Sequence, residues 1–593
     1  MKAFKKIMAL ALMGVMSLSV VACGGKSGDN RKPGGYDPTE KGEDGWAYND
    51  TVDETVTEIE IFKNDWAVFN NARSANSPVY SKIKSEVGFD IKAMNSSSNW
   101  QQQLGLMQAE GEMPDIFLTE GPEESEFFNS LIQNGDIIAI SDWVSEATYP
   151  NIYNYMKKFE YMRSNISYAG GKSWYIPSSW ANEKSLYVRQ DWIDNLNNKL
   201  ASVLVKEGVI ASESDMTEEI EKKWKFGAPK DLLEFYRLAR AFTLYDPDSN
   251  GTDDTTGYMS ESNKDMDAWV YMAFDTGWCQ FVKDGDSYVY SDVTEGSMYA
   301  TAYITRLITD GYMSLDSLTA DNGTKQDRFS QGKAGMIYAH NWLNNFLSAI
   351  MSVTKCSIEE ARSKVLMCDP PAGKNGAWNG AGQDLSWQGF CINANMSNSR
   401  IRACLDLYEY LLSDEGYQLL QYGVEGEHYE VDAQGNKTSL LQRNPEGFYL
   451  SIVSADPATM LYALVDWTMH YRSTVQSNAD IIVPRQERSE ANSYKSDYPA
   501  LYTEASIDYL ADCHSLFEET VALLEKNEKG LYMQKTANYN PTTFGWDQLY
   551  TVSAVFQNKW KSMVKNYKEY GGTVIFEEYN DYIASGKAVK VTK

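Results

Sequence analysis

The sequence predicts an α/β fold that is divided into at least two lobes. Strand-like and helix-like segments alternate between residues 58 and 118, as they do in βαβ units with a largely parallel sheet. The chain has 593 residues. About 540 of them remain once a leader and a linker are set aside, which is more than one hydrophobic core holds.

The chain begins with a secretory leader, residues 1–23. Three lysines in the first six residues precede a charge-free apolar run from residue 7 to residue 21. This run of roughly 15 residues is shorter than the ~20 that span a bilayer. Its end resembles the lipobox of bacterial lipoproteins, in which Cys23 would become the lipidated N-terminus. The resemblance implies a protein tethered to the outer face of the cell membrane; an ordinary cleaved signal or an uncleaved anchor are the alternatives.

Residues 24–55 are predicted to be a flexible linker. Glycine, proline and charged residues dominate this segment, and almost no apolar side chain is available to order it. A flexible coil of about 30 residues reaches on the order of 30 Å. The linker would therefore hold a folded domain clear of the lipid headgroups.

Composition excludes some partners. The formal net charge of -28 argues against nucleic acid or an anionic membrane surface, because both require clustered cations. No Cys-x-x-Cys motif is present, and a chain of this size needs no disulfides for stability, although fifteen pairings of six cysteines are possible. The cysteines expected to be free, buried thiols are Cys279, Cys356, Cys368, Cys391, Cys404 and Cys513.

The first α/β units place two candidate ligand-binding residues. Residues 58–62, 90–94 and 116–118 are predicted strands, with helical patterns between them. In open sheets of this kind, ligands bind beyond the carboxyl ends of the strands. Trp66 and Glu120 follow two of these ends, so both are expected at the ligand site.

A nine-residue loop resembles a calcium site. Residues 246–254 (DPDSNGTDD) carry oxygen-bearing side chains at positions one, three, five and nine and glycine at position six, as in an EF-hand. The glutamate usual at position twelve is replaced by Gly257, so a carboxylate from elsewhere would complete the shell. An acidic surface turn is the alternative. The expected ligands of a structural Ca²⁺ are Asp246, Asp248, Asn250, Asp254 and the backbone carbonyl of Thr252.

Short blocks spread along the chain carry a family resemblance. They are residues 111–116 (GEMPDI), 171–177 (GKSWYIP), 187–192 (YVRQDW), 328–336 (RFSQGKAGM), 412–417 (LSDEGY) and 422–429 (YGVEGEHY), together with the calcium-like loop. Their order and spacing resemble the extracellular solute-binding proteins of carbohydrate-type ABC importers, in the lipoprotein branch of Gram-positive bacteria. One departure is Ala228, where the family usually has a Thr or Ser that caps the next helix.

This resemblance implies a periplasmic-binding-protein-like fold of type II, similar to maltose-binding protein, with extra C-terminal helices. Two α/β lobes would close on a ligand by hinge motion. The first lobe would comprise residues 56–178 and 379–446, and the second lobe residues 179–378 and 447–593. The implied protein is a monomeric receptor that performs no chemistry and delivers a saccharide, expected to be an oligosaccharide, to ABC permease subunits.

Aromatic residues flanked by amides and carboxylates are expected in the cleft, because sugars present flat C–H faces and many hydroxyls. Trp180 lies beside Asn182 near the first expected crossing between lobes, and Trp387 lies near Asp384 at the return crossing. Trp342 follows a His-Asn turn, where maltose-binding relatives carry a stacking tryptophan. Packing in the core is the alternative for each tryptophan.

Two other classes of function remain open from the sequence. A tethered glycoside hydrolase needs two carboxylates at a set separation, and 82 acidic residues leave that possible. The four histidines have no metal-ligand spacing, and neither Gly-x-Ser-x-Gly nor His-Glu-x-x-His occurs. A surface adhesin would lack a small-molecule cleft. The block pattern favours the saccharide receptor over both.

Overall fold

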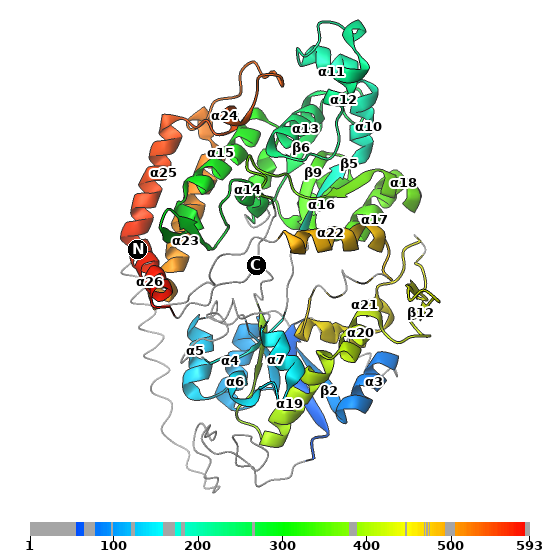
Figure 1. Ribbon diagram of the computed structural model, residues 1–593, viewed down its shortest axis with the longest axis vertical. Helices are drawn as coiled ribbons and strands as arrows, with labels where there is room; N and C mark the ends of the chain where they lie inside the picture. Colours follow the sequence, from blue (N-terminus) through cyan, green and yellow to red (C-terminus); the bar gives the residue numbers. More distant parts are fainter. Residues whose placement is uncertain are drawn as a thin grey trace.

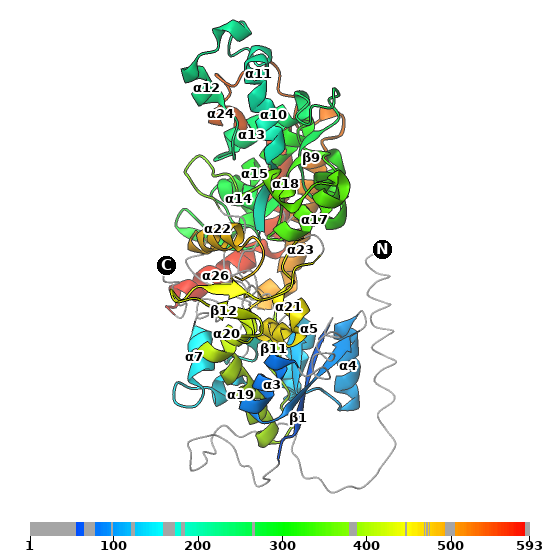
Figure 2. The same ribbon diagram turned by 90° about the vertical axis from the view of Figure 1, so that its right-hand side faces the viewer.

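Two α/β lobes lie one above the other along the long axis of the molecule (Figures 1 and 2). The computed structural model describes residues 55–64, 77–96, 99–119, 125–157, 172–178, 184–263, 267–378, 388–444, 447–467, 469, 473, 475–492 and 504–586. We call the lobe that holds the N-terminal strands the lower lobe and the other the upper lobe. The expectation of a two-lobed α/β fold is confirmed.

The lower lobe is built on a five-stranded sheet with the strand order β2-β1-β3-β11-β4. Strands β1, β2 and β3 are parallel, as the alternating sequence predicts, whereas β11 runs antiparallel to both β3 and β4. The elements of the first segment are β1 (Glu58–Asn64), α3 (Pro78–Val87), β2 (Asp90–Ser96), α4 (Trp100–Glu110), β3 (Ile116–Thr119), α5 (Ser125–Asn134), α6 (Ile140–Trp143), α7 (Pro150–Lys157) and β4 (Ile176–Pro177). The chain returns later through β11 (Gly389–Ile392), α19 (Asn398–Leu411), α20 (Asp414–Tyr422), β12 (Tyr429–Val431), β13 (Lys437–Ser439), α21 (Ile452–Ala455) and the 3₁₀ helix η7 (Pro457–Leu464).

The upper lobe is built on a four-stranded sheet with the order β10-β5-β9-β6. Strand β9 pairs in parallel with β6 and antiparallel with β5, so this sheet is mixed rather than largely parallel. Its elements before the return crossing are β5 (Lys184–Arg189), α10 (Gln190–Asn198), α11 (Leu200–Lys206), α12 (Glu218–Trp224), α13 (Leu232–Leu244), β6 (Thr256–Met259), α14 (Ala268–Ala273), β7 (Phe281–Asp284), β8 (Ser287–Tyr290), the 3₁₀ helix η5 (Ser291–Val293), α15 (Glu295–Asp310), α16 (Asn322–Ser330), β9 (Ala334–His340), α17 (Leu343–Thr354), α18 (Ile358–Ser363) and β10 (Val365–Cys368).

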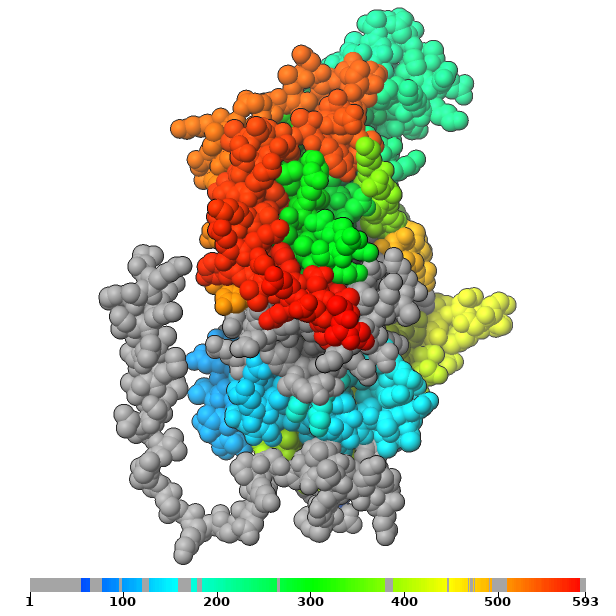
Figure 3. Space-filling view, turned by 60° about the vertical axis from the view of Figure 1, so that its left-hand side comes forward, coloured from blue at the N-terminus to red at the C-terminus, as the bar shows by residue number. Residues whose placement is uncertain are grey.

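The C-terminal helices complete the upper lobe, as the family resemblance implies. They are α22 (Ala479–Ala491), α23 (Glu504–Lys526), α24 (Trp546–Leu549), α25 (Ala554–Tyr567) and α26 (Thr573–Ala584). Phe517, Val521 and Trp560 join the same apolar core as strand residues such as Leu186. Figure 3 shows α25 and α26, in red, covering one side of this lobe.

Local signals define the helix ends that the sequence suggested. Pro78 is the first residue of α3, Ser77 caps it by accepting a hydrogen bond from the amide of Tyr80, and Gly88 ends it at φ 83°. The cap that the family pattern places at Ala228 is supplied three residues later. Asp231 is the N-cap of α13 and accepts a hydrogen bond from the amide of Glu234.

A carboxylate at the start of β3 ties the lower lobe together. Asp115 is 5% exposed and accepts hydrogen bonds from the backbone amide of Glu60 at 2.8 Å and from Arg400 Nε at 3.0 Å. Arg400 Nη2 also pairs with this carboxylate. Because Glu60 lies in β1 and Arg400 in α19, the Pro-Asp pair of the family pattern joins two strands and a helix.

The cores show where the chain passes between lobes. Pro177 ends a strand of the lower sheet, and Lys184 begins one of the upper sheet; Cys368 and Gly389 mark the return. Phe448 packs in an upper-lobe core, but residues from Ala458 to Met469 pack in the lower core. Residues of the lower core therefore lie beyond residue 446, the expected end of that lobe, and a further crossing precedes α22.

Candidate ligand-binding site

Strand β9 ends at His340, at the edge of the upper sheet that faces the lower lobe. Strand β5 starts at Lys184, only six residues after Ser178 of the lower lobe, and Lys184 pairs with His340 of β9. The end of β9 and the start of α17 therefore lie beside the first crossing. Trp342, an expected ligand residue, lies here half-buried, with its ring stacked on that of His340 at 4.9 Å and 21°.

A buried amide fixes the turn that carries Trp342. Asn341 is 2% exposed, accepts a hydrogen bond from Ser185 Oγ at 2.6 Å, and donates from Nδ2 to Gln486 Oε1 at 2.9 Å. Ser185 belongs to β5 and Gln486 to α22, so the turn is attached to two elements that adjoin crossings. A buried amide with both its oxygen and nitrogen satisfied holds one rotamer. Trp342 is thereby presented by a rigid turn.

Arg485 of α22 contacts residues at both the first crossing and the return crossing. Its guanidinium is 1% exposed, with Nε 2.8 Å from Asp369 Oδ1 and Nη2 donating to the carbonyl of Lys184 at 2.9 Å. Trp378, at the return crossing, lies under the same guanidinium at 5.9 Å. Burial lowers the pKa of Arg485, and the nearby Asp369 opposes that effect. No local sequence pattern marks Arg485, because its partners are over 100 residues away.

The facing edge of the lower sheet is also well ordered. Lys63, near the end of β1, is 4% exposed and its Nζ lies 4.4 Å from the ring centre of Trp467. Ser178, after β4, donates from Oγ to the carbonyl of Ala463 at 2.7 Å and from its amide to the carbonyl of Gln388 at 3.1 Å. The segment that leads from the lower core to α22 therefore begins beside the ends of β1 and β4. Trp467 was not among the ligand-binding residues expected from the sequence, where its position after Asp466 was the only signal.

The other expected ligand residues lie outside the described residues, but several of their neighbours do not. Thr119 precedes Glu120 and is paired with Gly389 across β3 and β11, and Gln388 follows Trp387. Because β1 and β3 are parallel and β11 is antiparallel, the ends of β1, β3 and β4 and the start of β11 share one sheet edge. The expected residues that lie outside the described ranges are Trp66, Glu120, Trp180, Asn182, Asp384 and Trp387.

The calcium-like loop lies at the end of α13, in the upper lobe. The carboxylate of Asp246 accepts hydrogen bonds from the amides of Asn250 at 3.0 Å and Gly251 at 3.2 Å. The side-chain amide of Asn250 donates to Asp248 at 2.9 Å and Asp254 at 3.1 Å. Gly251, at φ 87°, makes the turn that gathers these groups.

The surroundings of the carboxylates in this loop shift their pKa values in opposite directions. Burial raises the pKa of Asp248, and the charges of Asp246 and Asp254 raise it further. A hydrogen bond from Lys333, at 2.6 Å, holds the pKa of Asp254 below its usual range. Within the described ranges, no group of three or more His, Cys, Asp or Glu side chains converges as metal ligands do.

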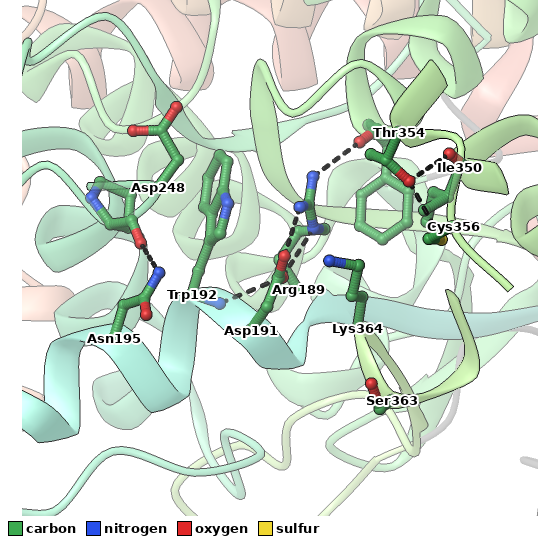
Figure 4. Close-up of polar contacts among 12 residues, drawn as sticks. Arg189, Asp191, Trp192, Asn195, Asp248, Ile350, Thr354, Cys356, Ser363 and Lys364 are labelled. Atoms are coloured by element: carbon green, nitrogen blue, oxygen red, sulfur yellow. Dashed lines mark hydrogen bonds and ion pairs between the residues drawn. The ribbon is translucent and has the colours of Figure 1, made fainter. Parts of the chain in front are cut away.

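Packing explains why the twelfth position of the loop is glycine. Gly257 lies in β6, and a Cβ there would be 2.1 Å from the carbonyl oxygen of Ala239 in α13. A glutamate cannot occupy this position without moving the helix from the sheet. The loop is instead anchored on its other side by Asn195 of α10, which donates to the carbonyl of Pro247 at 3.0 Å. Figure 4 shows Asn195 pointing to the segment that carries Asp248.

The chain forms two α/β lobes and passes between them several times. Polar and aromatic side chains lie beside these crossings, at the facing edges of the two sheets. This architecture is that of a two-lobed solute-binding protein. The chain belongs to the family of bacterial extracellular solute-binding proteins, whose pattern matches residues 79–426. This match supports the binding interpretation over that of a hydrolase. None of the helices in the described ranges has the length and apolarity to cross a bilayer.

Two curated relatives come from Bacillus subtilis (strain 168). The polygalacturonan/rhamnogalacturonan-binding protein YtcQ is 24% identical over 334 residues, which are 56% of this chain and 58% of the relative. Lipoprotein LipO is 21% identical over 393 residues, 63% of this chain and 68% of the relative. The match thus spans 58% of YtcQ and about two thirds of LipO.

Solved structures share the fold over most of the chain. An extracellular solute-binding protein from Bifidobacterium longum subsp. infantis has a TM-score of 0.57 at 14% identity, covering 90% of this chain and 99% of that one. The alginate-binding protein AlgQ2, solved without calcium ion, has a TM-score of 0.55 at 14% identity, covering 89% and 97%. At this identity the likeness concerns the fold.

Proposed function

We propose that this protein is the substrate-binding lipoprotein of an ABC importer and that it captures a saccharide, expected to be an oligosaccharide, between its lobes. The observation that carries the proposal is the half-buried Trp342, presented by a rigid turn at the edge of the upper sheet that faces the lower lobe. An aromatic face held this way matches the apolar C–H face of a sugar ring. The names of YtcQ and AlgQ2 concern saccharides and support the same class of ligand.

The ligand would be held by both lobes. Trp66, Glu120, Asp384 and Trp387 are proposed to contact it from the lower sheet edge, and Trp180 and Asn182 from the first crossing. Closure would then depend on the crossings, where Arg485 already joins the start of β5 to α22. The closed shape is what a permease can distinguish from the open one, because a ligand that prefers the closed state shifts the population toward it.

We also propose a structural Ca²⁺ in the loop from Asp246 to Asp254. The donor types and the Gly251 turn fit a hard cation, and the pKa of Asp248, which burial raises and the charges of Asp246 and Asp254 raise further, would fall if a cation lay beside it. Asp246, Asp248, Asn250, Asp254 and the carbonyl of Thr252 would hold the ion. Because Gly257 cannot be replaced by a glutamate, another oxygen must complete the shell.

The anchor proposed for this receptor is the lipidated Cys23, followed by the linker. The name of LipO, a lipoprotein, supports it. Two or more acyl chains anchor a protein stably, while one does so marginally.

A thermal-shift screen of the purified protein against saccharides of defined length tests the function. A ligand present at about 100 times its Kd stabilises the folded state by about 2.7 kcal/mol. We expect stabilisation by at least one oligosaccharide, with a larger shift than its constituent monosaccharide gives. Stabilisation by amino acids or peptides, with none by any saccharide, would refute the proposal.

A further inference from the structure

Three side chains in the upper lobe form a cysteine–histidine–aspartate cluster that the proposed ligand site does not use. Cys279 Sγ lies 3.5 Å from His514 Nε2, and His514 Nδ1 lies 2.8 Å from Asp292 Oδ2. Cys279 comes from the loop between α14 and β7, Asp292 from η5, and His514 from the middle of α23. The arrangement has the order of a nucleophile, a base and a carboxylate that orients the base.

The backbone holds Cys279 and Asp292 in one unit. The amide of Ser291 donates to the carbonyl of Gln280 at 2.8 Å, and the amide of Gln280 donates to Ser291 Oγ at 3.4 Å. These bonds join the residue after Cys279 to the residue before Asp292. The position of the thiol relative to the carboxylate therefore does not depend on a free loop.

The imidazole of His514 is fixed between aromatic rings and a buried carboxylate. Phe517 stacks on it at 5.6 Å, and Trp278 meets it edge-on at 6.0 Å. Asp292 is 1% exposed; burial raises its pKa, and the hydrogen bond and charge of His514 oppose that effect. When Nδ1 donates to Asp292, the lone pair of Nε2 faces the thiol, and Asp292 stabilises the imidazolium that forms if Nε2 takes the proton.

Other titratable groups face the same cluster. Glu518, one turn along α23, lies 3.5 Å from Nε2 and is about half exposed, so it competes with the thiol for this nitrogen. Tyr567 of α25 adjoins Asp292, and burial raises its pKa, which keeps its hydroxyl neutral. Among the described residues, Glu518 is therefore a charged side chain that opposes a thiolate at Cys279.

The remaining described cysteines have different surroundings. Cys391, Cys404 and Cys513 are buried, and burial raises the pKa of Cys513 to about 11. Burial also raises the pKa of Cys368 to about 12. Cys356 is half-buried and its sulfur accepts a hydrogen bond from Thr354 at 3.0 Å, as Figure 4 shows. Cys279 is exposed and Cys356 is half-buried, so the expectation of a buried thiol is wrong for both. Cys356 is an internal reference for a thiol that contacts a hydroxyl instead of an imidazole.

We propose that Cys279 is a reactive thiol, activated by His514 and positioned by Asp292, that exchanges with small-molecule disulfides. In this step the Cys279 thiolate attacks one sulfur of R–S–S–R, a Cys279–S–S–R bond forms, and the S–S bond of the small molecule breaks. The Cys279 sulfur is oxidised and the leaving sulfur is reduced. The proton that His514 took from Cys279 passes to the leaving thiolate, which departs as R–SH.

The test measures the rate of each cysteine in the folded, full-length protein. Iodoacetamide alkylation at pH 6.5, and mixed-disulfide formation with cystine, are followed for each cysteine by peptide mass spectrometry. An ordinary thiol with a pKa of about 8.5 is roughly 1% thiolate at pH 6.5, and the lower nucleophilicity of a more acidic thiolate offsets part of the gain. We expect Cys279 to react roughly 5- to 10-fold faster than Cys356.

Three variants separate activation from exposure. His514→Gln removes the base and should lower the alkylation rate of Cys279 several-fold. Asp292→Asn should change the pH at which the rate of Cys279 reaches half its maximum. Glu518→Gln removes the competing charge and should raise the rate of Cys279. The rate of Cys356, measured in the same samples, should stay constant in all three.

Two results would overturn the proposal. The first is a Cys279 rate no higher than that of Cys356 in the wild-type protein at pH 6.5. The second is an unchanged Cys279 rate in His514→Gln, with circular dichroism showing that the variant is folded. If His514→Gln does not fold, Glu518→Gln decides, because this half-exposed residue tolerates substitution and an unchanged or slower rate there contradicts the proposed competition.

Discussion

Replacing Asp115 with alanine should destabilise the lower lobe more than any exposed ion pair does. The variant leaves the partly buried amide of Glu60 without its acceptor, and it removes the carboxylate from Arg400, whose side chain is 27% exposed. An unsatisfied buried amide costs about 1–3 kcal/mol. Breaking a fully buried pair costs about 3–5 kcal/mol, which the partial exposure of Arg400 reduces. Together these effects give an expected loss of about 3–4 kcal/mol.

Calorimetry measures this loss as a fall in the melting temperature of the lower lobe. The lower lobe has roughly 200 residues, and unfolding entropy of about 2.1 cal/mol/K per residue gives about 0.4 kcal/mol/K. The transition of this lobe should therefore fall by about 8 °C in Asp115→Ala. Asp115→Asn keeps an acceptor for the amide of Glu60 while removing the charge, so its shift should be about half as large.

The matched control is Lys82→Ala, also in the lower lobe. Lys82 pairs with Glu415 at 2.7 Å, but the two side chains are 43% and 55% exposed. An exposed pair of this kind contributes about 0–1 kcal/mol. If Asp115→Ala melted within a degree of Lys82→Ala, the contacts of Asp115 with Glu60 and Arg400 would stabilise the lobe no more than an exposed ion pair does.

Four further outcomes are expected. Burial lowers the pKa of His428, whose Nδ1 accepts a hydrogen bond from the amide of Val424 at 2.9 Å, so its contribution to stability is complete above the unfolded pKa of about 6.5 and is lost as the pH falls below it. His428→Gln should therefore lose less stability than the wild-type protein between pH 7 and pH 5 in denaturant titrations, and parallel curves would contradict this. Trp342→Ala should weaken saccharide binding by roughly 3- to 10-fold in calorimetric titration while Trp342→Phe keeps most of the affinity, and equal affinities would mean that the ring packs without touching ligand. Chelation should lower the melting temperature of the upper lobe, and calcium should restore it; Asp248→Asn should reduce this response, whereas no response together with no bound calcium would leave an acidic turn. Cys23→Ala should abolish partitioning into detergent when the leader is processed in a Gram-positive host, and equal partitioning of both proteins would exclude the lipid anchor.

The family blocks acquire physical reasons in the structure. In the block at residues 422–429, Gly423 lies at φ 79°, and a Cβ there would be 2.5 Å from His428 Nδ1. The glycine and the histidine therefore depend on each other. Asp115, from the block at residues 111–116, pairs with Arg400, which is 285 positions later. The block is a local pattern, but the reason for it is not local.

The sequence by itself determined the α/β class, the need for two lobes, the strands that begin the lower sheet and the calcium-like loop. These follow from periodicity, length and turn residues, all of which operate within about ten to twenty positions. The resemblance also singled out Trp342 as a candidate for stacking on a sugar, from its place after the His-Asn turn.

Only the tertiary structure decided which distant residues meet. The mixed upper sheet, the return of residues 458–469 to the lower core, and the joining of the crossings by Arg485 all depend on contacts between residues far apart in the sequence. The same is true of Cys279 and His514, which are separated by 235 positions and appear in the sequence as an unremarkable cysteine and an isolated histidine. Side-chain chemistry is written in the sequence, but the distances that give it a function are set by how the two sheets and the C-terminal helices pack.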